Sequence, residues 1–142
     1  MTYEIRNKKI LIIGLGSSGK RYLNVLRKLK FKNFYILSKS KNKYCKSINS
    51  LNNLKKINPD FVLICSETYK HYDQLKKINS LLKNKNIIVE KPLFHKIINL
   101  DKINNKIFVG FNLRFHPVFK FVKKEIEKNM TNFFDLKFIC YS

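Results

Sequence analysis

The chain has 142 residues, a length that suits one domain of ordinary size. Its hydrophobic content of 44%, with 12 phenylalanines, excludes an intrinsically disordered chain despite a formal net charge of +21. No apolar run approaches the roughly 18 residues of a membrane-spanning helix, and the amino terminus lacks a signal-peptide pattern. The cysteines, Cys45, Cys65 and Cys140, form no CxxC pair. We therefore expect no disulfide framework, no metal site and a cytoplasmic location.

The positive charge comes mainly from lysine. Of the 30 basic residues, 26 are Lys and 4 are Arg, and 17 Asn and 17 Ile accompany them. Lys, Asn and Ile share A/T-rich codons, so a biased genome explains all three excesses. Sites that recognise phosphates or base edges favour arginine, and they gather their charge on one face. We expect nonspecific, salt-sensitive contacts with polyanions, and no specific nucleic-acid partner and no membrane partner.

The first forty residues predict a βαβ unit. Residues 8–15 read KKILIIGL, a continuous apolar run typical of a strand that is buried on both faces of a parallel sheet. Helical spacing follows over residues 22–30. Residues 34–37 (FYIL) then form the second expected strand. A strand, a glycine turn, a helix and a strand in this order indicate a parallel sheet.

Further elements extend this pattern. Strands are expected at residues 61–65, 86–89 and 107–111. Residues 66–68 lead into a helix that turns Tyr72, Leu75, Ile78 and Leu82 inward. Residues 39–56 are polar, with a short helix from about Leu51 capped by Ser50. A final helix is expected to begin at Pro117, and a final strand at residues 133–141. The sequence predicts an α/β fold with a doubly wound parallel sheet.

The turn after the first strand reads GLGSSG. In a dinucleotide site, Gly14 permits the tight turn, Gly16 lets the backbone approach a pyrophosphate, and Gly19 lets helix and strand pack closely. Ser17 and Ser18 precede a helix whose free N–H groups and dipole attract phosphate. The context of strand, turn and helix favours a dinucleotide site. A glycine-rich turn without a ligand is the alternative.

The end of the second expected strand bears on the choice of cofactor. NAD-preferring sites place an Asp or Glu there, which binds the ribose 2′-hydroxyl. This chain has Ser38, Lys39 and Ser40 instead, with no carboxylate between Glu4 and Asp60. Two hydroxyls and a cation suit a 2′-phosphate, so NADP(H) is favoured over NAD(H). A solvated lysine is the alternative.

Four segments together resemble the Gfo/Idh/MocA family, which contains glucose–fructose oxidoreductase, inositol dehydrogenase and their relatives. They are GLGSSG, ETYKH at residues 67–71, EKP at 90–92 and GFNLRFHP at 110–117, and the match runs through nearly the whole chain. The resemblance implies a Rossmann-type NAD(P)-binding domain of an oxidoreductase. Such an enzyme acts on the CH–OH group of a small, sugar-like substrate by hydride transfer.

The resemblance also implies roles for individual residues. Lys91 is expected to be the catalytic residue beside the nicotinamide, where an ammonium can donate a hydrogen bond to a substrate oxygen or relay a proton. Its position at the carboxyl end of a strand, where open α/β sheets bind ligands, favours this role over that of a surface lysine. For His71, a packing role is the alternative. The other implied cofactor-site residues are Thr68, Glu90, Pro92, Asn112 and Arg114.

Two features depart from the family pattern. Residues 93–109 form a short crossover, so its helix is expected to be clipped or partly lost. Family members also continue into an antiparallel substrate domain. We therefore expect residues 1–115 to form the Rossmann domain and residues 116–142 to supply the first helix and strand of a truncated α+β second domain, with self-association through residues 133–141. The alternative is a non-catalytic dinucleotide-binding module or a truncated pseudoenzyme.

Overall fold

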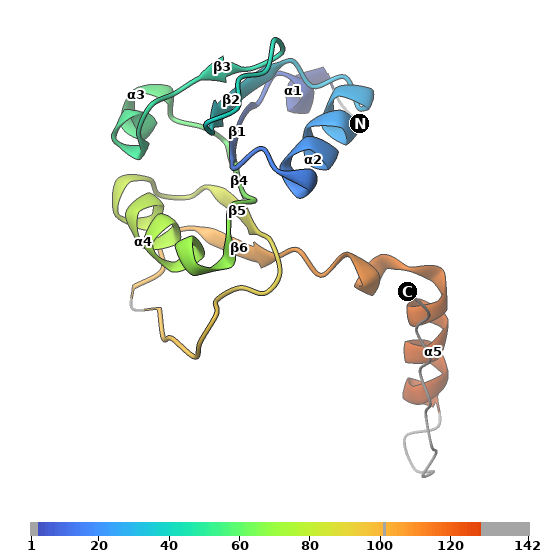
Figure 1. Ribbon diagram of the computed structural model, residues 1–142. Helices are drawn as coiled ribbons and strands as arrows, with labels where there is room; N and C mark the ends of the chain where they lie inside the picture. The colour runs from blue at the N-terminus through green and yellow to red at the C-terminus, as the bar shows by residue number, and fades with distance from the viewer. Residues whose placement is uncertain (1–2, 101, 129–142) are drawn as a thin grey trace. The chain divides into compact units, whose positions relative to one another are not determined.

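The computed structural model describes residues 3–100 and 102–128, and the chain divides into two units, Met1–Gly110 and Phe111–Ser142. The first unit contains a sheet of six parallel strands in the order β3-β2-β1-β4-β5-β6 (Figure 1). The chain runs outward from β1 to one edge and then returns to build the other half from β4. This is the strand order of a doubly wound Rossmann fold, so the expected fold is confirmed. The strands are β1 Lys9–Ile13, β2 Asn33–Leu37, β3 Lys46–Ser47, β4 Phe61–Ile64, β5 Asn86–Val89 and β6 Lys106–Val109.

Helices cover both faces of the sheet. Alternate residues of β1 enter two different hydrophobic clusters: Ile10 and Ile12 pack with Leu23 of α2, whereas Leu11 and Ile13 pack with α4. Because both faces of the strand are buried, its sequence is continuously apolar. Burial of each such side chain stabilises the fold by about 1.5–3 kcal/mol. The helical segments of this unit are α1 Tyr3–Arg6, α2 Ser17–Lys28, η1 Leu51–Asn53, α3 Leu54–Ile57, η2 Thr68–Lys70 and α4 His71–Leu81.

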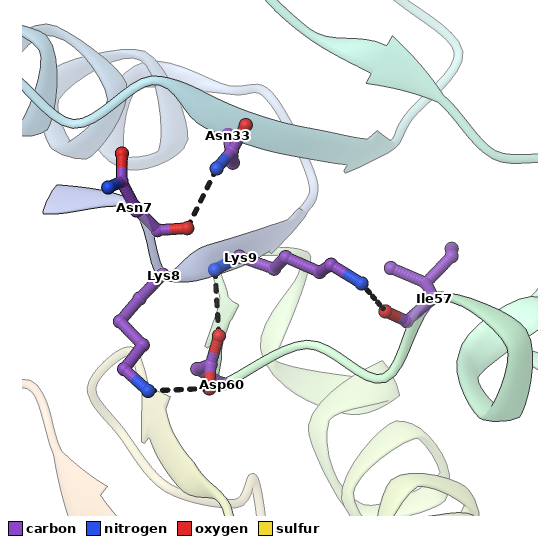
Figure 2. A network of polar contacts seen from close by, with 6 residues as sticks. All are labelled: Asn7, Lys8, Lys9, Asn33, Ile57 and Asp60. Carbon is purple, nitrogen blue, oxygen red and sulfur yellow. Dashed lines mark hydrogen bonds and ion pairs between the residues drawn. The ribbon is translucent and has the colours of Figure 1, made fainter. Parts of the chain in front are cut away.

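A polar network ties the amino-terminal ends of the central strands together (Figure 2). The backbone N–H of Lys9 donates to Asp60 Oδ2 at 2.8 Å, and its ammonium donates to the Ile57 carbonyl at 3.0 Å. The Asn33 amide donates to the Asn7 carbonyl at 2.7 Å. These bonds join β1 to the residues that lead into β4 and to the start of β2. They satisfy polar groups at the end of the sheet that ligands do not use in open α/β folds.

Several boundaries differ from the sequence expectation. The last strand of the sheet ends at Val109, and not at residue 111, because its partner β5 ends at Val89, whose carbonyl accepts from the Gly110 N–H at 2.8 Å. The short strand β3 and the helix α1 were not expected. The turn at η1 agrees with the prediction, since Ser50 Oγ accepts a hydrogen bond from the Asn52 N–H at 3.1 Å.

The connection from β5 to β6 contains no helix in its described residues, which goes beyond the clipped or partly lost helix that the short crossover predicted. Asparagine side chains hold it instead. Asn79 Oδ1 accepts bonds from the Asn104 N–H (2.8 Å) and the Asn105 amide (3.0 Å). Asn105 is 8% exposed, donates to the Leu82 carbonyl at 2.9 Å and accepts from the Lys85 N–H at 2.9 Å. This network anchors the crossover to the end of α4.

The second unit contains a turn η3, Asn112–Phe115, and a helix α5, Pro117–Lys128. Pro117 begins the helix, as expected from its fixed φ and missing N–H. The strand expected at residues 133–141 lies outside the described residues. Among the helices that the structure describes, none has both the length and the apolar composition needed to cross a bilayer.

Candidate functional site

A cavity of about 880 Å³ opens at the carboxyl ends of β1, β2 and β4. In open α/β sheets this edge, where the strand order reverses, is the place for a ligand. Most of the lining comes directly after these three strands, so the fold itself brings it together. Of the residues singled out in the sequence, the cavity is lined by Gly14, Gly16, Ser17, Ser18, Ser38, Lys39 and Ser40.

Two glycines of the turn are required by close backbone packing. Gly14 has φ +84°, and a Cβ there would lie 2.7 Å from the Ser66 nitrogen and 2.8 Å from the Cys65 carbonyl oxygen. Its N–H donates to the Leu37 carbonyl at 3.0 Å, which joins the turn to the end of β2. At Gly19, a Cβ would overlap the carbonyl oxygen of Gly14. The helix can therefore approach the strand only if both positions are glycine.

Gly16 differs, because nothing in the described chain requires a glycine there. Its backbone is extended (φ −71°, ψ −161°), and no heavy atom lies within 4 Å of the position of a Cβ. Gly16 is the N-cap of α2, and no side chain caps the helix. The first N–H groups of the helix, from Ser17 onward, have no partner within the helix, and its dipole adds positive potential. The open space therefore suits an anionic group that approaches the backbone.

The end of β2 forms one wall of the cavity. Ser38 Oγ accepts a hydrogen bond from the Ser40 N–H at 3.2 Å, so the Ser38 hydroxyl hydrogen can still be donated elsewhere. Lys39 beside it is exposed. Residues from after β4 contribute a charged pair to the lining, with Lys70 Nζ 3.0 Å from Glu67 Oε2. A backbone hydrogen bond and the bond from Lys70, with a smaller effect of Lys39, lower the pKa of the Glu67 carboxyl.

The EKP segment follows β5 and does not line this cavity. The Glu90 N–H donates to the Ile64 carbonyl at 2.9 Å, which continues the β4–β5 ladder. Lys91 and Pro92 are exposed and are joined by a cis peptide bond. The segment thus presents Lys91 at the carboxyl edge of the sheet, one strand away from the cavity-lining end of β4.

His71 is 1% exposed and also lies outside the cavity lining. Its Nδ1 lies 3.1 Å from the Pro92 carbonyl oxygen and 3.2 Å from that of Leu93, and its Nε2 lies 3.0 Å from the carbonyl oxygen of Ser66. Thr68 is half-buried at the start of η2. The contacts of His71 are those of a residue that joins two loops.

The half-buried Tyr22 lies against Glu90, at the start of the EKP segment. Burial and the interaction with the Glu90 carboxylate raise the pKa of Tyr22, which belongs to α2. Burial, and then the charge of Glu90, raise the pKa of the Cys65 thiol to about 12. Each shift favours the neutral form, because a second negative charge next to Glu90 in a poorly solvated place is unfavourable.

Comparison with known proteins identifies the family. The sequence model of the oxidoreductase family Gfo/Idh/MocA, described as an NAD-binding Rossmann fold, matches residues 8–106. The chain belongs to the Gfo/Idh/MocA family. The expectation drawn from the glycine turn and the EKP segment is therefore confirmed. None of the curated proteins matches the chain.

Solved dehydrogenase structures share the fold. A dehydrogenase (MviM) from Clostridium difficile is 27% identical with a TM-score of 0.60, over 87% of this chain and 44% of that one. A putative myo-inositol dehydrogenase from Sinorhizobium meliloti is 22% identical (TM-score 0.67, 87% and 42%). The WlbA dehydrogenase from Bordetella pertussis, in complex with NADH and UDP-GlcNAcA, is 16% identical (TM-score 0.69, 86% and 42%). The chain thus spans less than half the length of these relatives.

The remaining residues that the Gfo/Idh/MocA pattern suggests lie in the second unit. Asn112 begins η3 and is exposed. Arg114 is exposed, and its Nε donates to the Phe111 carbonyl at 3.1 Å. Among the described residues of the chain, no group of three or more His, Cys, Asp or Glu side chains could hold a metal ion.

Sequence reasoning missed part of the cavity wall. Ser66 Oγ donates to Gln74 Oε1 at 2.7 Å, and both residues line the cavity. Glu67 and Lys70 belong to the ETYKH segment, so their place after a strand was a usable signal. Asn49 had no such signal, because it follows the unexpected strand β3.

Proposed function

We propose that this chain binds a nicotinamide dinucleotide in the cavity at the glycine turn, as the nucleotide-binding part of an NAD(P)-dependent oxidoreductase. The observation that carries this proposal is the open space at Gly16, at the uncapped start of α2. Packing explains Gly14 and Gly19, whereas Gly16 is explained by a ligand that comes close to the backbone. Family membership supports the same conclusion.

The residues present fit the chemistry of a dinucleotide. The N–H groups at the start of α2 would hold the pyrophosphate, with the hydroxyls of Ser17 and Ser18 beside them. The first turn of this helix carries no acidic residue that would repel an anion. When bound, the dinucleotide supplies a nicotinamide that carries hydride.

We propose NADP(H) as the preferred form. The support is the exposed cation of Lys39 between two serines, where the Ser38 hydroxyl hydrogen is free to be donated to a 2′-phosphate. NAD(H) is the second candidate, and the specific observation in its favour is Glu67, a carboxylate in the lining of the same cavity. The structure of the Bordetella pertussis relative contains NADH.

We propose Lys91 as the catalytic residue. An exposed ammonium at the carboxyl edge of the sheet can donate a hydrogen bond to a substrate hydroxyl or carbonyl oxygen and can hold the proton that accompanies hydride transfer. The supporting observation is its place on a segment fixed to β4 and β5. The remaining site residues of this proposal are Thr68, His71, Glu90, Pro92, Asn112 and Arg114.

The substrate we propose is a sugar or a sugar derivative. The support is by analogy, since the relative from Bordetella pertussis is in complex with UDP-GlcNAcA.

We further propose that residues 1–115 are the nucleotide-binding domain and that residues 116–142 begin the substrate domain. The division of the chain after Gly110 supports a boundary in this region. A cytoplasmic location stays a prediction from the cysteine pattern.

The experiment that tests the proposal is a calorimetric titration of NADPH into wild type and Gly16→Asp. Asp is a good N-cap residue, so the variant should keep or gain about a few tenths of a kcal/mol of stability. Its carboxylate would occupy the phosphate site, so saturable binding should be lost. Gly16→Ala is the size control and should weaken binding less. Unchanged affinity in a folded Gly16→Asp variant would contradict the proposed site.

A further inference from the structure

The backbone around Lys91 is held on both sides by side chains from two different helices. Residue 90 lies against Tyr22 of α2, and residues 92 and 93 lie against His71 of α4. These helices pack on opposite faces of the sheet. The segment that carries Lys91 therefore contacts the helices on both faces of the sheet.

His71 joins this segment to the wall of the cavity. Its Nδ1 faces the carbonyls of Pro92 and Leu93, and its Nε2 faces the carbonyl of Ser66, which lines the cavity. Carbonyl oxygens only accept hydrogen bonds, so a ring with a proton on one nitrogen holds one loop, and a ring with a proton on both holds the two loops together. At 1% exposure, water cannot replace these bonds readily.

Tyr22 holds the other side of the segment through Glu90. A Cβ added at Gly110 would lie 3.2 Å from Glu90 Oε1 and 3.3 Å from the Tyr22 hydroxyl oxygen, so both polar atoms lie close to Gly110. The lack of a side chain at Gly110 thus leaves room for this pair. A protonated phenol can donate to the carboxylate, and it keeps its proton because burial and Glu90 disfavour the phenolate.

Lys91 itself is exposed, and no hydrogen bond or ion pair fixes its ammonium within the described part of the chain. A long, flexible side chain of this kind is directed mainly by the backbone from which it starts. We propose that Tyr22 and His71 are positioning residues for Lys91, which act by holding the Glu90–Leu93 segment and so fix where the ammonium meets the nicotinamide end of the site. This inference rests on the proposed function.

The first test measures amide hydrogen exchange of Glu90, Lys91, Leu93 and Phe94 in the free chain. Each lost hydrogen bond should speed exchange about five- to tenfold, both in Tyr22→Phe and in His71→Leu. His71→Gln should recover part of the protection, because its amide can donate to one of the two loops.

The matched controls remove a tyrosine hydroxyl and a histidine ring that do not contact the backbone of Glu90 or Lys91. Tyr72→Phe removes a hydroxyl from a half-buried tyrosine that contacts Phe94 through its ring, and His95→Asn removes an exposed histidine. Neither control should change exchange at Glu90 or Lys91. Exchange rates at the segment that stay at wild-type values in folded Tyr22→Phe would contradict the inference, as would equal effects of the controls.

The second test separates positioning from general stability. NADPH and 2′-phospho-ADP-ribose share every group except the nicotinamide ring. Tyr22→Phe should weaken NADPH about three- to tenfold and leave 2′-phospho-ADP-ribose unchanged, and the effect should vanish when Glu90→Gln is already present. Equal loss for both probes, or additive effects with Glu90→Gln, would overturn the positioning role. If wild type binds neither probe, the proposed function fails, and the exchange experiment alone decides whether the segment is held as proposed.

Discussion

At the scale of single residues, the turn after β1 separates glycines that serve packing from one that does not. A side chain at Gly14 would collide with the backbone of Cys65 and Ser66, and a side chain at Gly19 would collide with Gly14. At Gly16 the same side chain would enter open space in the cavity. A glycine that the fold itself does not need is evidence for a ligand, and this division agrees with the roles that the glycine pattern gave to the three positions.

We expect Cys65 to react slowly in the native protein. A pKa of about 12 leaves about a thousandfold less thiolate at pH 8 than the ordinary pKa of 9.0, and the thiolate is the reactive form. Native Cys65 should therefore be alkylated by iodoacetamide about a thousandfold more slowly than in the unfolded chain, with a rate that rises about tenfold per pH unit up to pH 12.

The variant Glu90→Gln tests the cause of this shift. Removing the negative charge should lower the Cys65 pKa and speed alkylation at pH 8, although burial, the larger cause, remains. Asp73→Asn, an exposed charge change on α4, is the matched control and should leave the rate unchanged. A native Cys65 that reacts as fast as an unfolded thiol would show that this end of β4 is not desolvated.

Cofactor choice should depend on Ser38. In wild type, an ion pair near the surface and the hydroxyl donors together should favour NADPH over NADH about tenfold. Ser38→Asp should reverse the preference, because a carboxylate attracts the ribose 2′-hydroxyl and repels a 2′-phosphate. Competitive calorimetric titrations of the two dinucleotides measure both ratios. Equal affinities in wild type would mean that Lys39 is only solvated and that NAD(H) is an equal ligand.

At the scale of elements, the sequence predicted those that carry a signal in their own residues. The continuous apolar run of β1 and the Pro117 start of α5 are local signals, and both predictions were confirmed. Strand β3 has only Lys46 and Ser47, both exposed, and it exists because Tyr35 and Ile36 of β2 offer an edge. Such an element has no pattern of its own.

The same limit applies to the site. Residues that directly follow a predicted strand could be assigned to the site from the sequence, because parallel strands bring their carboxyl ends together. Asn49 and Gln74 could not, since they reach the cavity through an unexpected strand and a bond from Ser66. The buried position of His71 is likewise determined by its contacts with the carbonyls of Pro92 and Ser66, which lie in two other loops. The sequence could not distinguish a cavity-lining histidine from a packing histidine at this position.

The asparagine network that replaces a crossover helix gives a stability prediction. Asn105→Ala should lower the free energy of unfolding by about 2 kcal/mol, because the Leu82 carbonyl and the Lys85 N–H lose their buried partner. Urea denaturation followed by circular dichroism measures the change. Asn99→Ala, an exposed position in the same connection, is the control. A change below about 0.5 kcal/mol at Asn105 would mean that water replaces the network.

At the scale of the whole molecule, an anion can bind in two ways: weakly to the surface, because of the charge of +21, or specifically in the cavity. A dinucleotide carries several negative charges, so lysines anywhere on the surface attract it weakly, and salt screens that attraction. A specific dinucleotide site differs from this surface attraction because its contacts are confined to one edge of the sheet. The amino-terminal edge also carries lysines: the Lys8 ammonium pairs with Asp60, and the Lys9 backbone N–H donates to the same carboxylate (Figure 2). This edge provides an internal reference.

Mapping NADPH onto the backbone amides by NMR, in physiological salt, tests the central claim most directly. The account predicts saturable shifts concentrated at Gly14 to Gly19 and at Ser38 to Ser40, with Lys8, Asn33 and Asp60 unchanged. Their loss in Gly16→Asp would tie them to the start of α2. Shifts spread over the lysine-rich surface without saturation, or saturable shifts outside the cavity, would contradict a dinucleotide site at the glycine turn.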